Sequence, residues 1–189
     1  MANYADSDYR ITGSAEELDA LYILMRQLEK EKENGNWVGH IVKALNDDVI
    51  PEGLYVRGWW DSLERESDCI YFHLESAWEP LIEVWDFIAA KFDTLQVWFS
   101  GVEEGCELFQ HRPNWEKGWF TDGYAVDLLV PDDCECRTEY FSDIDSAFRF
   151  IENYTDSNII TADDVEAINR VWQEKDEDAF LYLHEFQEV

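Results

Sequence analysis

The chain has 189 residues, of which 46% are apolar and 15% aromatic, with nine Trp. That is enough apolar material to bury a core, and too much for a disordered chain. Forty-three acidic residues against 14 basic ones give a net charge of −29, whereas a small soluble domain carries a magnitude of roughly 2–8. Because such a charge repels nucleic acid and anionic membranes, we expect neither to bind directly. The charge alone is compatible with basic proteins or cations as partners, and we expect a basic protein.

The sequence predicts a soluble, cytoplasmic protein. No apolar run approaches the ~18 residues of a membrane span. The polar, acidic N-terminus lacks the basic region and the apolar stretch of a signal peptide. The four cysteines, Cys69, Cys106, Cys134 and Cys136, form no recognisable disulfide framework, so we expect reduced thiols.

The first hundred residues predict alternating strands and helices. An alternating stretch stops at Gly13, and Ser14 with Glu17 three residues later predicts a capping box that opens a long helix. Trp59 and Trp60 are adjacent on a predicted strand, so their side chains should face opposite ways. The predicted elements are a strand over 8–13, helices over 15–33 and 37–45, strands over 54–63 and 69–75, a helix over 80–92 and a strand over 94–100.

This order of elements is that of the split βαβ, or ferredoxin-like, pattern. We therefore predict the α+β fold class, with a ferredoxin-like core over residues 1–101. Two long helices should pack on one face of an antiparallel sheet, and the crossovers should be right-handed.

Residues 102–189 predict an extension of short strands, two helices and a final strand. Short strands over 106–111, 118–121, 123–130 and 137–141 should extend the sheet as a meander. Ser142 with Asp145, and Thr161 with Asp164, predict the N-termini of the two helices. Residues 180–189 alternate and predict the closing strand. We treat 102–189 as part of the same domain, and a separate small subdomain is the alternative.

Several short motifs resemble one known family. They are Met1-Ala-Asn3, Thr12-Gly13 before a capped helix, Tyr55-Val-Arg-Gly-Trp59, Glu75-Ser-Ala-Trp78 with Pro80, Val84, Phe87 and Ile88, Val102-Glu-Glu-Gly105, and residues 120–127. Together they are similar to the YubB-like (Api92-like) ferredoxin-like family of bacteriophages, plasmids and gut bacterial genomes. Gly105-Cys106 departs from it, because relatives carry Pro-Gly there. The resemblance implies the fold, a mobile-element origin and a bacterial host cell, and it supplies no catalytic residues.

No catalytic motif stands out. The chain has no phosphate loop, Gly-rich dinucleotide turn, Gly-x-Ser-x-Gly or His-Glu-x-x-His. Cys69 and His73 share a face of one strand but would lie about 13 Å apart, too far for a nucleophile and its base. Cys134 and Cys136 lack zinc spacing, and Asp143-Ile-Asp145 lacks the ligand pattern of a calcium loop. We expect no enzyme, no cofactor and no metal.

The acidic residues predict a binding surface. Duplex DNA presents one negative charge per ~1.7 Å of its axis, and a rigid acidic protein can imitate that density. Loop tryptophans supply anchors of the kind that interfaces use. The predicted partner-binding residues are Asp132, Asp133, Glu135, Glu139, Asp143, Asp145, Asp163, Asp164, Glu174, Asp176, Glu177, Asp178, Trp115 and Trp119.

The charge, the aromatic residues and the resemblance together support three hypotheses about function. The leading hypothesis is a phage or mobile-element inhibitor that mimics nucleic acid and blocks a host nucleic-acid-binding protein, such as a CRISPR effector or a nuclease. The alternative is an accessory protein that binds a basic partner or self-associates, with the charge serving solubility. The third is a small enzyme with a carboxylate site. The sequence leaves the oligomeric state open.

Overall fold

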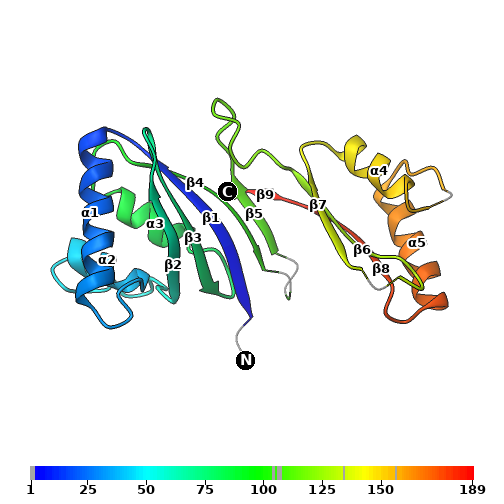
Figure 1. Ribbon diagram of the computed structural model, residues 1–189, viewed down its shortest axis with the longest axis horizontal. Helices are drawn as coiled ribbons and strands as arrows, with labels where there is room; N and C mark the ends of the chain where they lie inside the picture. Colours follow the sequence, from blue (N-terminus) through cyan, green and yellow to red (C-terminus); the bar gives the residue numbers. More distant parts are fainter. Residues whose placement is uncertain (1–2, 104, 106–107, 134, 156) are drawn as a thin grey trace. The chain divides into compact units, whose positions relative to one another are not determined.

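The chain divides into two compact units, each with its own sheet and its own buried cluster (Figure 1). This division comes from a computed structural model that describes residues 3–103, 105, 108–133, 135–155 and 157–189. The first unit is Met1–Phe120 with Glu188–Val189, and the second is Thr121–Gln187. Within the described residues, no helix combines the length and the apolar character that crossing a membrane requires.

The first unit is a six-stranded sheet with three helices on one face, in the strand order β2-β3-β1-β4-β5-β9 (Figure 1). The strand pairs β1–β3, β1–β4, β2–β3 and β4–β5 are all antiparallel. Its elements are β1 (Tyr4–Thr12), α1 (Ala15–Glu31), α2 (Val38–Leu45), β2 (Gly58–Arg65), β3 (Cys69–Ala77), α3 (Ile82–Ala89), β4 (Gln96–Glu103), β5 (Leu108–Arg112) and β9 (Gln187–Glu188).

Alternation along the strands explains the core of the first unit. Every second residue of β1 and β3 faces the helices, which brings Tyr9 against Phe72 with ring centroids 5.2 Å apart. Trp85 of α3 packs on Phe72 at 4.4 Å. Trp60 is fully buried while Trp59 is half-exposed, so the predicted opposite orientation of this pair is confirmed.

One half of the capping box predicted at the start of α1 is present. The Ser14 hydroxyl accepts from the Glu17 N–H at 3.4 Å, which confirms Ser14 as the cap. The Glu17 carboxylate accepts instead from the N–H groups of Asp93 (2.8 Å) and Thr94 (2.9 Å), so no capping box closes there. The Thr94 hydroxyl also donates to this carboxylate and lowers the pKa of Glu17 the most, and the backbone hydrogen bonds lower it further.

The second unit is a three-stranded antiparallel sheet, in the order β7-β6-β8, with two helices. Its elements are β6 (Tyr124–Leu129), β7 (Arg137–Phe141), α4 (Ile144–Glu152), α5 (Ala162–Lys175) and β8 (Phe180–Glu185). The helices bury their apolar stripes on one face of this sheet. The buried cluster contains Val126, Leu128, Ala147, Phe148, Ile151, Ile159, Val165, Trp172, Ala179 and Leu181.

One of the two predicted helix caps in this unit is confirmed. Thr161 and Asp164 form a capping box at the start of α5. The predicted Ser142–Asp145 cap of α4 is wrong, because Asp143 is the cap and its carboxylate accepts from the Ser146 N–H at 2.9 Å. The helix therefore begins one residue later than predicted, and the cap reaches the Ser146 N–H instead of the Asp145 N–H.

Three predictions about strands fail. Residues 118–121 form no strand, because Asn114 and Trp119 close a small turn as an isolated bridge. Of the predicted meander, only β5 extends the first sheet, while β6 and β7 build the separate sheet. The closing strand is two strands in different sheets, since it breaks at Phe186, whose N–H bonds to the Gly123 carbonyl. The first residues of the strand predicted over 106–111 lie outside the described residues.

Candidate partner-binding surfaces

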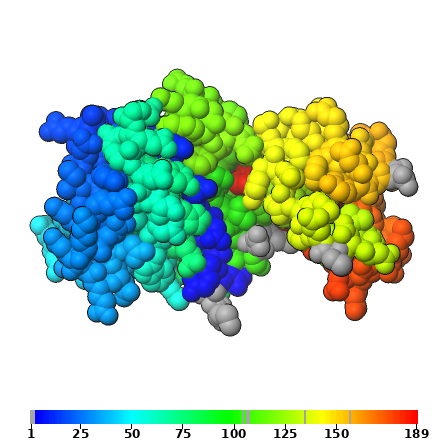
Figure 2. All heavy atoms as spheres, in the orientation of Figure 1, coloured from blue at the N-terminus to red at the C-terminus, as the bar shows by residue number. Residues whose placement is uncertain are grey.

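The predicted partner-binding residues divide between the two units. All twelve acids lie in the second unit, and both tryptophans lie in the first. Ten of the twelve acids are exposed, and Asp164 and Asp176 are half-buried. In Figure 2 the end of α5 and the following turn, orange to red, lie at the surface.

Three of these acids hold the backbone of the second unit. Asp143 caps α4, and Asp164 accepts from the N–H groups of Ile160 (3.0 Å) and Thr161 (2.9 Å). Backbone hydrogen bonds therefore lower the pKa of both carboxyl groups. Asp176 accepts from the N–H groups of Asp132 and Asp178, each at 3.1 Å.

Two further acids pair with a base. Arg137 contacts the carboxylates of Asp133 at 3.1 Å and Glu135 at 2.9 Å. These side chains are exposed enough that each pair contributes little to stability. Neighbouring Cys134 lies outside the described residues.

Seven acids remain whose carboxylates make no described contact. They are Asp132, Asp145 and Asp163, together with Glu139, Glu174, Glu177 and Asp178. Their charges therefore face solvent and are available to a partner.

The acids converge at the C-terminal end of α5. The hydrogen bond from the Asp132 N–H to Asp176 joins the β6–β7 turn to the α5–β8 turn. Glu174, Glu177 and Asp178 are neighbours in the sequence, and Lys175 is the sole base of the last turn of α5. A helix C-terminus carries a partial negative charge, so acids placed there are destabilising. We call residues 132–133 and 174–178 the turn cluster, and its acids repel one another and the end of α5.

The two predicted tryptophans differ in their surroundings. The Trp119 ring lies 4.7 Å from the Arg10 guanidinium and 5.8 Å from the Lys117 ammonium, so it is held on the sheet of the first unit. Trp115 is 63% exposed. Trp115 is therefore the better candidate for an anchor.

Sequence reasoning missed a polar network on the face of the first sheet opposite the helices. Asp8 of β1 accepts from the Tyr71 hydroxyl at 2.8 Å and contacts His73 Nδ1 at 3.1 Å, both on β3. Burial and Asp8 raise the pKa of Tyr71 to about 12. Burial alone would lower the pKa of His73, but the hydrogen bond to Asp8 and the charges of Asp8, Asp61 and Asp6 outweigh it and raise that pKa. Alternation placed these residues on one face, but the strand register was needed to pair them.

Cys69, which lies on the same strand as His73, belongs to a different cluster of polar side chains. Ligand atoms of Glu66, Asp68 and Cys69 lie within 4.8 Å of one another, a spacing that a metal ion would fit. Two cations already occupy these groups, since Arg10 pairs with Glu66 and Lys117 pairs with Asp68. Burial raises the pKa of the Cys69 thiol, which disfavours the thiolate that a metal or a nucleophile needs.

A contact between a histidine and an aspartate lies on the sheet of the second unit. His184 Nε2 lies 3.1 Å from the Asp127 carboxylate, which also accepts from the Thr138 hydroxyl at 2.5 Å. Burial would raise the pKa of Asp127, but these two hydrogen bonds lower it. The Thr138 hydroxyl is bonded to the carboxylate and not to the imidazole, so this is not the arrangement of a nucleophile beside its base.

Comparison with known proteins adds nothing to this geometry. Family models, curated proteins and solved structures were searched, and none matches the chain.

Proposed function

We propose that the protein is an acidic, non-catalytic binding protein that mimics nucleic acid and blocks a basic, nucleic-acid-binding protein. The observation that carries the proposal is the charge of the second unit. Its 67 residues hold 18 acids and four bases, a net charge of −14. The seven acids without a described contact lie on strand, helix and turn surfaces that the backbone bonds of Asp143, Asp164 and Asp176 keep in place.

The repulsion among the acids of the turn cluster favours the binding of a basic partner. Acids at the end of α5 repel one another and the helix dipole in the free protein. A basic cleft that evolved for phosphates would relieve that repulsion on binding and release counterions from both surfaces. The same field would steer association, most strongly at low salt.

The proposal also covers the fold of the first unit and the origin of the protein in a phage or mobile element. The strand order β2-β3-β1-β4, with two strand–helix–strand halves and helices on one face, supports a ferredoxin-like core in the first unit. With the YubB-like resemblance, it supports a phage or mobile-element protein that acts in the cytoplasm of a bacterial host. A CRISPR effector or a nuclease is the kind of target that such an element gains from blocking.

Affinity capture from nuclease-treated bacterial lysate tests the proposal. The bait is compared with a variant in which the seven acids without a described contact become amides. The control variant carries the same change at seven exposed acids of the first unit, Glu31, Glu33, Asp47, Asp48, Glu52, Glu79 and Glu83. We expect a nucleic-acid-binding protein that is released by salt, displaced by added duplex DNA or RNA, and lost with the first variant alone. A partner that ignores salt, nucleic acid and the first variant would refute mimicry.

A second candidate is favoured by Trp115. Its 63% exposure suits an accessory protein that holds its partner, or a second copy, through an apolar anchor. Such an interface would survive high salt and would be lost in Trp115→Ala.

A further inference from the structure

Strand β4 has an open edge at its beginning. It pairs with β1 from Gln96 to Val102, but with β5 only from Phe99 to Glu103. Among the described residues, residues 96–98 therefore have a neighbouring strand on one side only.

The sequence after β5 explains why this edge stays open. β5 ends at Arg112, and Pro113 has no N–H with which to continue the ladder. The following loop closes on itself, since the backbone groups of Asn114 bond to Trp119. It is fixed over the opposite sheet face by the Lys117–Asp68 ion pair at 2.6 Å, and so does not return to β4.

Alternation identifies the backbone groups at the open edge. The His111 carbonyl accepts from the Val189 N–H at 3.1 Å, so the backbone groups of His111 face β9. Those of Arg112 then face β4, which makes Phe99 and Arg112 a hydrogen-bonded pair. Two residues earlier, the N–H and C=O of Val97 must point to the same edge.

Val97 is nevertheless only 4% exposed. Among the described residues, the β4–β5 ladder begins only at Phe99, and no hydrogen bond to these two edge groups is found. Backbone groups at so buried a position are almost always paired in folded proteins. An incoming strand would have to displace the atoms that cover this edge, and would then give the N–H and C=O of Val97 the partners that they lack.

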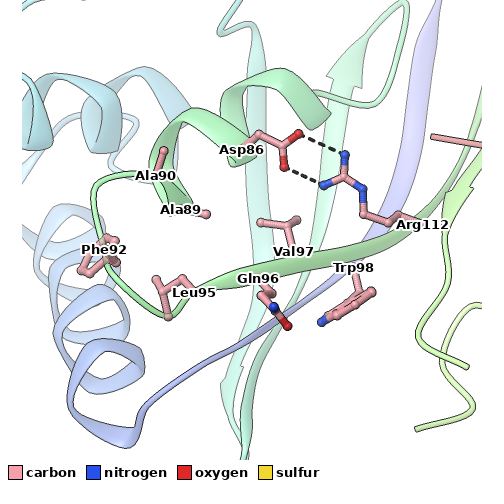
Figure 3. A pocket seen from close by; sticks show the side chains of 9 residues that line it. All are labelled: Asp86, Ala89, Ala90, Phe92, Leu95, Gln96, Val97, Trp98 and Arg112. Carbon is pink, nitrogen blue, oxygen red and sulfur yellow. Dashed lines mark hydrogen bonds and ion pairs between the residues drawn. The ribbon is translucent and has the colours of Figure 1, made fainter. Parts of the chain in front are cut away.

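A hollow of about 460 Å³ lies beside this edge (Figure 3). This volume is within the range of ligand sites, ~300–1,000 Å³. Figure 3 shows Phe92 and Leu95 at one end, and Asp86 and Arg112 at the other. Asp86 and Arg112 neutralise each other through two contacts of 2.6 and 3.0 Å. Between the ends the lining mixes apolar and polar atoms and comes from the end of α3 and the start of β4. Its residues are Asp86, Ala89, Ala90, Phe92, Leu95, Gln96, Val97, Trp98 and Arg112.

We propose that this site binds an extended segment of a partner protein as an added strand. The segment makes two main-chain hydrogen bonds to Val97 and places one apolar side chain in the hollow, the mode by which other domains add a peptide to a sheet edge. A helix or a lipid would leave the Val97 groups unpaired. The residue in the hollow is apolar, because the Asp86–Arg112 pair leaves no charge free there. Lysine or arginine flanks it, because the chain carries a net charge of −29.

A second copy of the chain is a poorer occupant. It would bring two strongly acidic molecules together along an edge only three residues long. The proposed site lies wholly in the first unit and does not depend on the acidic surface of the second.

A display library of random nine-residue peptides, selected on the full chain, tests the site. Ala90 is exposed and lines the hollow, so Ala90→Phe fills it from the solvent side. Ala20→Phe, at an exposed position of α1, is the matched control. We expect enriched peptides with an apolar residue between basic ones, which bind at least tenfold more weakly to Ala90→Phe and equally well to Ala20→Phe.

Two further measurements separate this site from other surfaces. N-methylation of the peptide amide that faces Val97 should abolish binding, and hydrogen exchange of the Val97 amide should slow when peptide is bound. Neutralising the seven acids of the second unit should leave the effect of Ala90→Phe unchanged, so this inference and the mimicry proposal can fail independently. The inference is overturned if no peptide prefers wild type to Ala90→Phe, or if every N-methylated peptide still binds. It is also overturned if Val97 becomes protected by protein concentration alone, since a second copy then fills the edge.

Discussion

The two units carry almost the same net charge on very different numbers of residues. The first has 25 acids and ten bases over 122 residues, a net −15, and the second has 18 acids and four bases over 67 residues, a net −14. In the first unit, ion pairs engage Arg10, Arg26, Arg65, Arg112 and Lys117. In the second unit, the described pairs of lysine or arginine involve Arg137 alone.

The first unit, which has the lower charge per residue, has the larger buried core. The first unit packs Tyr9, Phe72, Trp85 and Phe99 into one aromatic cluster among many buried aliphatic side chains. The second unit has a smaller cluster in which Trp172 is the single buried tryptophan. The unit with the higher negative charge per residue therefore has the smaller buried cluster. Under our proposal this is the cost of a surface kept ready for a basic partner.

Removal of an aromatic side chain from the larger core should have the largest effect. We expect Trp85→Ala to destabilise the first unit by about 3–5 kcal/mol, because a fully buried side chain leaves a cavity. Hydrogen exchange resolved by residue should show the first unit losing protection while residues 124–185 keep theirs. Trp172→Ala is the reciprocal variant. Equal loss in both units from either variant would show that the comparison between them is wrong.

Neutralisation of the seven acids without a described contact should stabilise the second unit. We expect a net gain of about 1 kcal/mol at low salt, because the repulsion among these acids and with the end of α5 outweighs the favourable position of Asp145 and Asp163 in the first turns of α4 and α5. The gain should shrink at 1 M salt, where screening acts over ~3 Å. Chemical denaturation at two salt concentrations measures it. The seven-site control in the first unit should gain less, and an equal gain there would contradict the contrast in charge.

Loss of one helix cap should have a smaller, local effect. Thr161→Ala removes the hydroxyl that accepts from the Asp164 N–H, and should cost the second unit about 1 kcal/mol. Thr161→Ser keeps the hydroxyl and is the control. Thermal denaturation checks both variants, and an equal loss in Thr161→Ser would rule out capping as the cause.

The smallest effect should be a pH dependence confined to the first unit. Because the folded state raises the pKa of His73, its protonation stabilises the fold below the ordinary histidine pKa of about 6.5, and this contribution is lost as pH rises through the folded pKa. His73→Gln should therefore lower stability at pH 5.5 and have less effect at pH 9. Asp8→Asn should flatten the dependence. The same loss from His73→Gln at both pH values would show that packing, not charge, explains it.

Local signals in the sequence predicted local structure well. Ser14 and the Thr161–Asp164 box mark helix starts because capping is decided within four residues. The opposite burial of Trp59 and Trp60 follows from strand alternation alone.

Two local predictions failed, the Ser142 cap and the strand over 118–121, whereas the other failures depend on partners that are distant in the sequence. The Asp8–His73 contact requires the register between β1 and β3, 65 residues apart. The last strand splits because its two halves join different sheets, which periodicity cannot reveal. The acids near residues 132 and 176 were predicted from composition, but their meeting depends on one turn-to-turn hydrogen bond.

The most direct test of mimicry is the salt dependence of affinity for the captured partner. We would measure the dissociation constant of wild type, of the seven-site variant of the second unit and of the seven-site control of the first, between 50 and 300 mM salt. We predict a steep slope for wild type and the control, and a markedly shallower one for the second-unit variant, because fewer counterions are then released. Equal slopes for all three proteins would contradict the claim that the second unit imitates nucleic acid.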